Sequence, residues 1–214
     1  MDNSMIINPH GYWEGDNLPH GVDPELCHGL IKFFYDEYKN HLSEDNSKIY
    51  IIDIGCGNGF YTNRLNEIDE FVVHGYDGNP DTPYLAGANC GVFDFTQDAK
   101  ALGIHDWVLC LEVGEHIPEK YSNIFLDNLD YLADYGIVLS WSIPEYGGDG
   151  HVNPQPNQKI INEMEHRGFK FDKKDTEFLR DYATKYPNTG WWFKETLMVF
   201  RRVKDYRGME KLWE

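Results

Sequence analysis

The sequence of 214 residues predicts a doubly wound α/β fold built as a single domain. Segments of strand length alternate with segments of helical length, which is the order expected when helices join the parallel strands of one sheet. Several strand candidates are unbroken apolar runs, as expected for strands that are buried on both faces. A cluster of glycines follows the first of these runs, where a strand would meet a helix.

An N-terminal helical arm is expected to precede the sheet. Residues 1–48 form this arm and belong to the same domain as residues 49–214. The first 22 residues are rich in Gly, Pro, His and aromatic side chains and predict an ordered but irregular segment, which could fold over a ligand as a lid. Asp23 followed by Pro24 predicts a helix N-cap and a first helical residue, opening a helix that continues to about His41.

The remaining elements follow in alternating order. Six strands are predicted, at residues 49–54, 71–76, 91–95, 107–111, 136–141 and 195–202. Helices are predicted at about residues 60–67, 118–133 and 154–167, with residues 169–171 and a charged helical segment in the tail.

The charge balance limits the choice of partners. The chain has 19 Lys and Arg against 36 Asp and Glu, a formal net charge of -17 and a sequence pI near 4.8. Most of its surface should repel phosphate backbones and anionic lipid, which makes a nucleic-acid partner unlikely. Aromatic residues make up 15% of the chain, enough large rings to fill a core.

No segment predicts export or a membrane span. The longest apolar runs are far shorter than the roughly 18 residues that a spanning helix needs, and the first ten residues lack a basic and then apolar pattern. The four cysteines form no closely spaced pair, so we expect reduced thiols in a cytoplasmic protein.

The most specific local pattern is Asp53-Ile-Gly-Cys-Gly-Asn-Gly59, at the predicted junction of the first strand and the first helix. Its glycines let the backbone approach a ligand closely. A dinucleotide fingerprint would need glycine where Phe60 stands, which argues against an oxidoreductase that binds NAD. An acid two positions before the first glycine suits a ligand with an ammonium group better than a pyrophosphate.

Two further acids follow the next strands. Asp77 ends the second predicted strand and suits bidentate hydrogen bonding to ribose hydroxyls. Asp94 lies between Phe93 and Phe95, where its carboxylate could accept a hydrogen bond from an adenine amino group while a phenyl ring packs on the base.

These motifs resemble, in order, those of class I S-adenosylmethionine-dependent methyltransferases, over roughly residues 49–202. The resemblance implies a Rossmann-like sheet of seven strands whose last strand is antiparallel, and S-adenosyl-L-methionine as the cofactor. It further implies that the loop after the first strand faces the methionine moiety, Asp77 the ribose, and Asp94 with Phe95 the adenine. The implied cofactor-binding residues are Asp53, Gly55, Cys56, Gly57, Gly59, Asp77, Asp94, Phe95 and Glu112.

A Glu-x-x-Glu-His block follows the fourth strand. If this turn is helical, Glu112, Glu115 and His116 lie on one face. His151 follows the next strand, whose loop opens at the same edge of the sheet. Two carboxylates and two imidazoles without a thiolate suit Mg²⁺, Mn²⁺ or Fe²⁺ better than structural zinc.

This block resembles the metal site of small-RNA 2′-O-methyltransferases and the matching segment of ubiquinone-pathway O-methyltransferases. The resemblance implies that Glu112, Glu115, His116 and His151 bind a divalent metal, Mg or Mn, which lowers the pKa of the acceptor hydroxyl. A metal-free alternative uses His116 or His151 as general base, so the catalytic candidates are His116, His151 and Glu115.

The sequence therefore predicts an enzyme that transfers a methyl group from S-adenosylmethionine to an oxygen, with metal assistance. The expected acceptor is a carbohydrate or a small metabolite with a diol, and no membrane partner is expected. A noncatalytic cofactor-binding subunit remains the alternative from another class. Trp141 and Tyr146 could stack on the acceptor, whereas Trp191 and Trp192 are expected to anchor a core or a hairpin.

Overall fold

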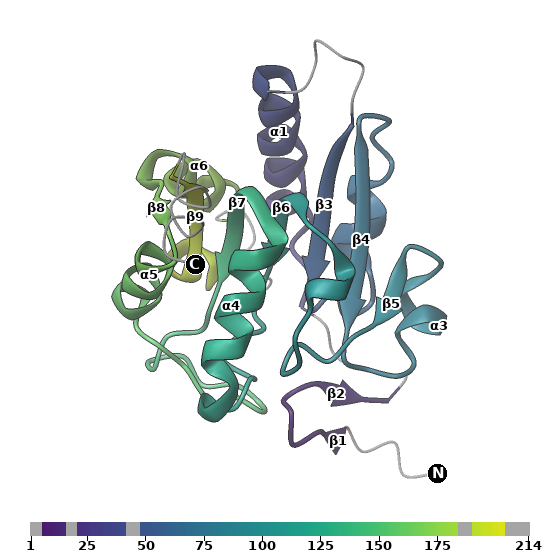
Figure 1. Ribbon diagram of the computed structural model, residues 1–214, viewed down its shortest axis with the longest axis vertical. Coiled ribbons are helices and arrows are strands. Elements are labelled where there is room, and N and C mark those ends of the chain that lie inside the picture. The colour runs from purple at the N-terminus through teal and green to yellow at the C-terminus, as the bar shows by residue number, and fades with distance from the viewer. Residues whose placement is uncertain (1–5, 16–20, 42–47, 184–189, 204–214) are drawn as a thin grey trace, which may run out of the picture.

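The structure, a computed structural model, describes residues 6–15, 21–41, 48–183 and 190–203. Its centre is a seven-stranded sheet in the order β5-β4-β3-β6-β7-β9-β8 (Figure 1). Neighbouring strands are parallel, except that β9 runs antiparallel to both β7 and β8, which confirms the predicted doubly wound sheet with an antiparallel last strand. The strands are β3 (Ile49–Ile54), β4 (Phe71–Asp77), β5 (Cys90–Val92), β6 (His105–Cys110), β7 (Ala133–Ser140), β8 (Phe169–Phe171) and β9 (Leu197–Arg202).

Helices cover both faces of the sheet (Figure 1). Ile52 and Ile54 of β3 point into a core shared with two of the helices, α4 and α5, and Ile49 and Ile51 into a second core shared with α1, α2 and α6. This burial on both faces explains why β3 is rich in isoleucine rather than alternating between apolar and polar residues. The helices are α1 (Pro24–His41), α2 (Phe60–Leu65), α3 (Thr82–Ala86), α4 (Ser122–Leu132), α5 (Asn157–His166), α6 (Lys173–Tyr182) and α7 (Phe193–Thr196), with 3-10 turns at Lys100–Leu102 and Glu119–Tyr121.

The strand order creates a crevice in the middle of the sheet. From β3 the chain crosses to β4 and β5 on one side, and from β6 it crosses to β7 on the other. The loops that follow β3 and β6 therefore diverge from each other at the carboxyl ends of these two strands. Doubly wound folds bind ligands at this place.

Two of the predicted strands have different bounds in the structure. The third predicted strand, 91–95, ends at Val92, because Asp94 accepts a hydrogen bond from the Thr96 backbone and turns the chain. The last predicted strand, 195–202, begins only at Leu197, because residues 193–196 form α7.

The N-terminal segment is more regular than the sequence predicts. β1 (Ile6–Ile7) and β2 (Trp13–Glu14) pair as an antiparallel hairpin. Asn8 closes it, since its side chain accepts from the His10 backbone at 2.9 Å and its carbonyl from Gly11 at 2.8 Å. Such a turn leaves no apolar periodicity, so the sequence pattern did not reveal it.

All four cysteines are buried and unbridged. No helix within the described ranges has the length and apolarity to cross a membrane.

Candidate functional site

A cavity of about 450 Å³ opens at the carboxyl ends of the central strands. The loops after β3, β4, β5, β6 and β7 line it, together with the N-terminal hairpin and the residues around α7. The cavity therefore lies at the crevice that the strand order creates.

The glycine loop forms the wall of the cavity after β3. Gly55, Gly57 and Gly59 all have left-handed backbone angles, with φ of 72°, 54° and 72°. A β-carbon on Gly55 would lie 2.2 Å from Cγ2 of Val113, so the loop depends on glycine for space as well as for conformation. Gly55, Cys56 and Gly57 line the cavity.

Gly59 lies outside the cavity lining, unlike the other predicted residues of this loop. It precedes α2, and a β-carbon there would lie 2.8 Å from Ala86. Its role in the structure is to let α2 and α3 pack closely.

Asp53 lies at the base of the glycine loop. It is almost fully buried, yet it lines the cavity, and Oδ2 accepts a hydrogen bond of 2.7 Å from the Thr62 hydroxyl. Burial raises its pKa to about 7, opposed by the hydrogen bond from Thr62. The carboxyl group is thus poised to ionise when a cation approaches it.

Asp77 ends β4 and connects two loops at the cavity. Oδ2 accepts a hydrogen bond from the Gly57 backbone at 3.0 Å, and Oδ1 accepts one from the Asn79 backbone at 2.9 Å. A carboxylate oxygen accepts more than one hydrogen bond, so Asp77 can also bind hydroxyls of a ligand in the cavity.

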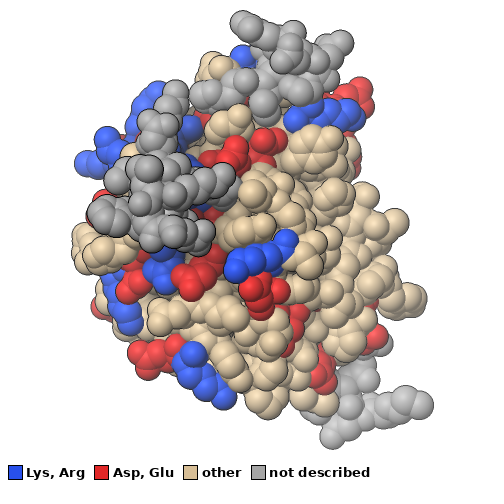
Figure 2. Space-filling view, in the orientation of Figure 1, with Lys and Arg blue, Asp and Glu red and all other residues tan. Residues whose placement is uncertain are grey.

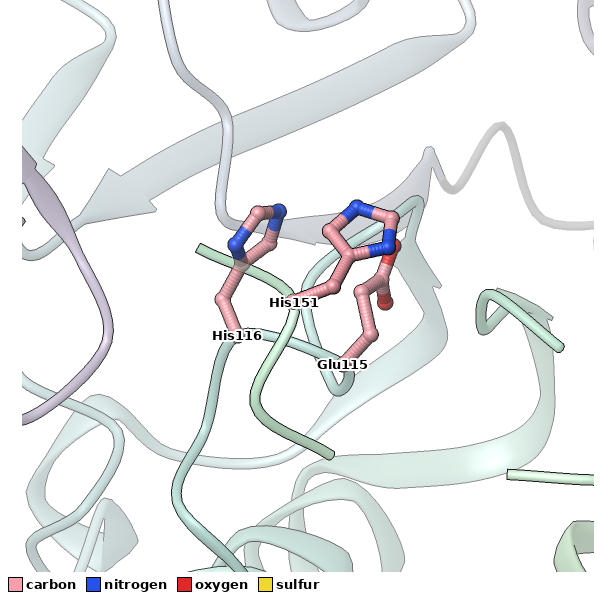
Figure 3. Close-up of side chains that lie close together, drawn as sticks. All are labelled: Glu115, His116 and His151. Carbon is pink, nitrogen blue, oxygen red and sulfur yellow. The ribbon is translucent and has the colours of Figure 1, made fainter. Parts of the chain in front are cut away.

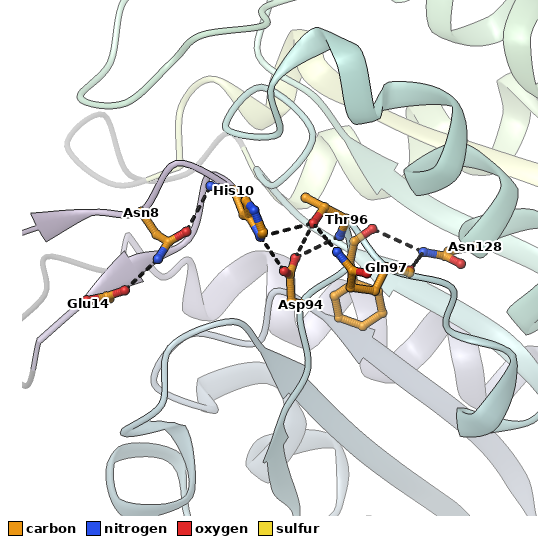
Figure 4. Close-up of polar contacts among 8 residues, drawn as sticks. Asn8, His10, Glu14, Asp94, Thr96, Gln97 and Asn128 are labelled. Carbon is orange, nitrogen blue, oxygen red and sulfur yellow. Dashed lines mark hydrogen bonds and ion pairs between the residues drawn. The ribbon is translucent and has the colours of Figure 1, made fainter.

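Asp94 contacts the hairpin as well as the cavity (Figure 4). Oδ2 lies 2.5 Å from Nδ1 of His10, and Oδ1 accepts a hydrogen bond of 2.8 Å from the Thr96 hydroxyl. Burial alone would raise the pKa of Asp94, but these hydrogen bonds, led by that of His10, hold it below 3.8. His10 was not among the predicted site residues.

The two phenylalanines beside Asp94 differ in exposure. Phe95, the residue predicted to pack on adenine, is only 5% exposed and belongs to the core. Phe93 is half-buried, lines the same cavity and packs on Phe95 with ring centroids 4.9 Å apart. Phe93 therefore offers the more accessible ring face.

The N-terminal hairpin covers part of the cavity. The ring of Tyr12 lies against Gly78, where a β-carbon would come within 2.3 Å of it. Trp13 meets the His116 ring edge to face, with centroids 5.4 Å apart. Both aromatic residues line the cavity, so the hairpin forms part of its wall. That the hairpin acts as a lid over a ligand stays a prediction.

The turn after β6 is not helical, which corrects the predicted arrangement of the Glu-x-x-Glu-His block. Glu112 has a left-handed φ of 55° and is the one non-glycine residue with positive φ among the described residues. This conformation directs its carboxylate to the Thr196 hydroxyl at 3.1 Å. Glu112 lines the cavity but lies outside the group of potential metal ligands, contrary to the expectation of four ligands.

Glu115, His116 and His151 do come together (Figure 3). Each offers one ligand atom, and these atoms lie within 4.8 Å of one another. The two imidazoles meet edge to face at 4.9 Å between centroids. His116 and His151 line the cavity, whereas Glu115 is fully buried behind its lining.

Backbone hydrogen bonds join the two loops that carry these residues. The carbonyl of Glu115 accepts from the backbone of Val152 at 2.9 Å and of Asn153 at 2.8 Å. The buried Asn153 side chain donates to the carbonyl of Ile117 at 3.0 Å. His151 is thereby held beside Glu115 although 36 residues separate them in the sequence.

The polar atoms of this group are incompletely satisfied. Among the described residues, the Glu115 carboxylate oxygens meet no N–H or hydroxyl donor but lie close enough to the Glu112 carboxyl group to share a proton with it, and Nδ1 of His151 has no hydrogen-bond partner. Burial, and then the neighbouring Glu112, raise the pKa of Glu115 well above 4.5. A buried carboxyl group without such a donor must stay protonated or acquire a cation.

Both histidines are neutral at pH 7. Burial lowers the pKa of His116 to about 4, and burial also lowers the pKa of His151. Nδ1 of His116 lies 3.2 Å from the Gly150 carbonyl, so this nitrogen carries the proton and Nε2 has a free lone pair. That lone pair can bind a metal or accept a proton.

The other end of the cavity is aromatic. Tyr146, Trp191 and Trp192 line it, although the sequence suggested that the two tryptophans only anchor the core. Trp141 is 1% exposed beneath Gly114, which excludes the predicted stacking of Trp141 on an acceptor.

The chain is similar to two curated proteins, and no protein-family model matches it. It is 25% identical over 140 residues to the ubiquinone biosynthesis O-methyltransferase of Rickettsia canadensis (strain McKiel), and 26% identical over 137 residues to that of Rickettsia typhi (strain ATCC VR-144 / Wilmington). Each alignment covers 61% of this chain, but 57% and 54% of those proteins. The chain therefore spans about half the length of the curated relatives it matches.

Solved structures resemble the chain over most of its length. Magnesium protoporphyrin IX methyltransferase of Synechocystis PCC 6803 with bound S-adenosylhomocysteine has a TM-score of 0.54 and 18% identity, over 88% of this chain and 90% of that one. The methyltransferase domain of bacterial CtHen1 has a TM-score of 0.55 and 15% identity, over 83% of this chain and 100% of that one. At such low identity, the likeness establishes the fold alone.

Proposed function

Because the chain has the Rossmann-like fold of class I S-adenosylmethionine-dependent methyltransferases, we propose that it binds S-adenosylmethionine and transfers the methyl group to a hydroxyl oxygen. One observation carries this proposal: Asp53, Asp77 and Asp94 lie at or just beyond the carboxyl ends of three neighbouring parallel strands and line a single cavity beside a glycine loop. A cationic sulfonium nucleoside with a ribose and an ammonium group matches this set of carboxylates.

The cofactor assignment fits the polar atoms of the cavity. Asp77 would accept the ribose hydroxyls, and Asp53 would face the methionine ammonium group. Asp94 and Phe93 would face adenine, with the Asp94 carboxylate shared with His10. When bound, S-adenosylmethionine supplies a methyl group on a cationic sulfur and leaves as the neutral thioether.

A divalent metal fits three of the four predicted ligands. A carboxylate oxygen of Glu115, Nε2 of His116 and the unpartnered Nδ1 of His151 form a set of one oxygen and two nitrogens, which suits Mn²⁺ or Fe²⁺ better than Mg²⁺ because Mg²⁺ prefers oxygen ligands. We propose Glu115, His116 and His151 as the ligands, with Glu112 outside the set. A bound divalent ion would lower the pKa of an acceptor hydroxyl.

The reaction must remove one proton from the acceptor. As the acceptor oxygen bonds to the methyl carbon, the carbon–sulfur bond breaks and the hydroxyl proton must leave. His116 and His151 are neutral and line the cavity, so either imidazole can receive that proton. A metal-free reaction with one of these histidines as general base is therefore the second candidate.

The acceptor is proposed to be a carbohydrate or a small diol. The described residues that line the cavity include no Lys or Arg to bind an anionic substrate. On the face shown in Figure 2, acidic and basic side chains are interspersed rather than gathered in a basic stretch. Both features support a neutral acceptor over a nucleic acid.

Isothermal titration with S-adenosylhomocysteine and with NAD tests the cofactor assignment. S-Adenosylhomocysteine is expected to bind with one site per chain, and NAD to bind far more weakly because Phe60 replaces the third glycine of a dinucleotide loop. Preferential binding of NAD would contradict the proposal. Binding of S-adenosylhomocysteine without methyl transfer to any hydroxyl would favour a noncatalytic subunit.

The affinity for S-adenosylhomocysteine is expected to fall as the pH decreases below about 7. Because the pKa of Asp53 is raised to about 7, an increasing fraction of Asp53 is protonated at lower pH and cannot attract the ammonium group of the ligand. The loss should approach about tenfold per pH unit. Titration calorimetry at several pH values measures it.

Asp53→Asn provides the control for this pH dependence. The variant should bind more weakly at pH 8 and show little change in affinity towards pH 6, since its side chain does not titrate. An equally steep loss of affinity in Asp53→Asn would assign the pH dependence to another group.

A further inference from the structure

An aromatic corner lies at the end of the cavity formed by the β7 loop and α7. The rings of Tyr146 and Trp191 meet at 68° with centroids 4.8 Å apart, and both line the cavity. Trp191 is 45% exposed, whereas the core residue Trp141 is 1% exposed. So large an exposed ring beside a cavity is typical of a binding surface rather than of a core anchor.

The corner is held in place without a ligand. The Tyr146 hydroxyl is hydrogen-bonded to the Glu195 carboxylate, which raises the pKa of Tyr146. The backbone carbonyl of Glu195 in turn accepts hydrogen bonds from Arg180 at 2.6 Å and from Asn157 at 2.5 Å. A ring platform fixed in this way loses little conformational entropy when a ligand stacks on it.

The described residues that line the cavity at this corner can accept or donate hydrogen bonds and include no Lys or Arg. Asp149 lines the same cavity, and Gly147 leaves open space in front of the backbone. An anionic group would be repelled by Asp149, whereas the hydroxyls of a neutral ring can donate hydrogen bonds to its carboxylate.

We propose that Trp191 and Tyr146 form the acceptor subsite for a neutral sugar ring. The apolar C–H face of the ring stacks on Trp191, and its hydroxyls donate hydrogen bonds to Asp149. His151 lies on the same loop as Asp149 and lines the same cavity, so a hydroxyl of the bound ring faces the proposed proton acceptor. This inference rests on the proposed methyl transfer to oxygen.

Ligand-observed NMR on the full chain saturated with S-adenosylhomocysteine tests this subsite. The probes are the methyl glycosides of glucose, mannose and galactose, with catechol and a short ribo-oligonucleotide as competitors. At least one glycoside is expected to bind, and Trp191→Ala should weaken its binding by about tenfold or more without changing the affinity for S-adenosylhomocysteine. Trp191→Phe should restore part of the binding because it keeps an aromatic face.

Tyr84→Ala is the matched control, since Tyr84 is 86% exposed on α3 and lies outside the cavity lining. It should leave glycoside binding unchanged. Binding of catechol or the oligonucleotide in place of every glycoside, or equal affinity in Trp191→Ala, would overturn the sugar subsite. A chain that fails to bind S-adenosylhomocysteine would overturn the proposed function itself, whereas cofactor binding without glycoside binding overturns this inference alone.

Discussion

Replacing Glu115 by glutamine is expected to reduce methyl transfer by on the order of 10³-fold while making the metal-free protein more stable. Glu115 is fully buried, and among the described residues its carboxylate oxygens meet no N–H or hydroxyl donor. Glutamine keeps the shape of the side chain but cannot supply the negative charge that a divalent cation requires.

The gain in stability should grow with pH. Burial raises the pKa of Glu115 in the folded protein above its unfolded value of about 4.5. The protonated Glu115 side chain therefore favours the folded state fully below about pH 4.5, and this contribution to the free energy of unfolding is lost as the pH rises through the pKa of the folded protein. Glutamine does not titrate, so the variant avoids this loss, with an advantage on the order of 1–3 kcal/mol at alkaline pH. Thermal unfolding in chelator at pH 6 and pH 9 measures the difference.

Glu112→Gln is the control for the metal assignment. Its carboxylate is hydrogen-bonded to Thr196 and lies beside that of Glu115, but Glu112 is outside the group of three potential ligands formed by Glu115, His116 and His151. Calorimetry with Mn²⁺ should therefore show one bound ion in Glu112→Gln and none in Glu115→Gln. Full activity of both variants in chelator would refute the metal and leave a histidine as the base.

Replacing Asp77 by alanine is expected to weaken the binding of S-adenosylhomocysteine by about 100-fold, which corresponds to roughly 2.7 kcal/mol. The variant loses the acceptors for the ribose hydroxyls and also the hydrogen bonds from the Gly57 and Asn79 backbones that hold the loops around the cavity. Hydrogen bonds to a charged group are worth about 1.5–3 kcal/mol each, so two lost contacts account for the effect.

Two further variants serve as comparisons for Asp77→Ala. Asp77→Asn keeps one oxygen acceptor and should bind with intermediate affinity. Asp69→Ala, an exposed acid beyond the opposite end of β4, should bind as the unmodified chain does. Titration calorimetry would contradict the assignment of Asp77 to the ribose if all three variants bound equally well.

Most of the sheet could be predicted because its strands are buried on both faces. The run from Ile49 to Ile54 is mostly apolar, and its four isoleucines divide between the two cores, one on each face of the sheet. The edge strand β5 was predicted less accurately, since only Cys90 of its three residues is buried and apolar periodicity is weak there.

In the Glu-x-x-Glu-His block, residue spacing alone did not predict the backbone conformation correctly. The i, i+3, i+4 spacing assumes helical backbone, but Glu112 adopts φ of 55° directly after β6 and its side chain points to Thr196. The pairing of Glu115 with His151 depends instead on backbone hydrogen bonds from Val152 and Asn153, which no local pattern encodes.

The hydrogen bond between His10 and Asp94 also could not be predicted from the sequence. The two residues are 84 positions apart, and their contact depends on the hairpin that Asn8 closes. The sequence suggested a lid from composition alone. The structure adds its contacts, Tyr12 on Gly78 and Trp13 on His116.

A crystal structure of the chain grown with S-adenosylhomocysteine and Mn²⁺ tests the central claim most directly. The ribose hydroxyls should lie against Asp77, with the sulfur directed to an anomalous manganese peak held by Glu115, His116 and His151. A nucleoside bound outside this cavity, or a manganese ion away from these three side chains, would contradict a metal-assisted methyl transfer at this site.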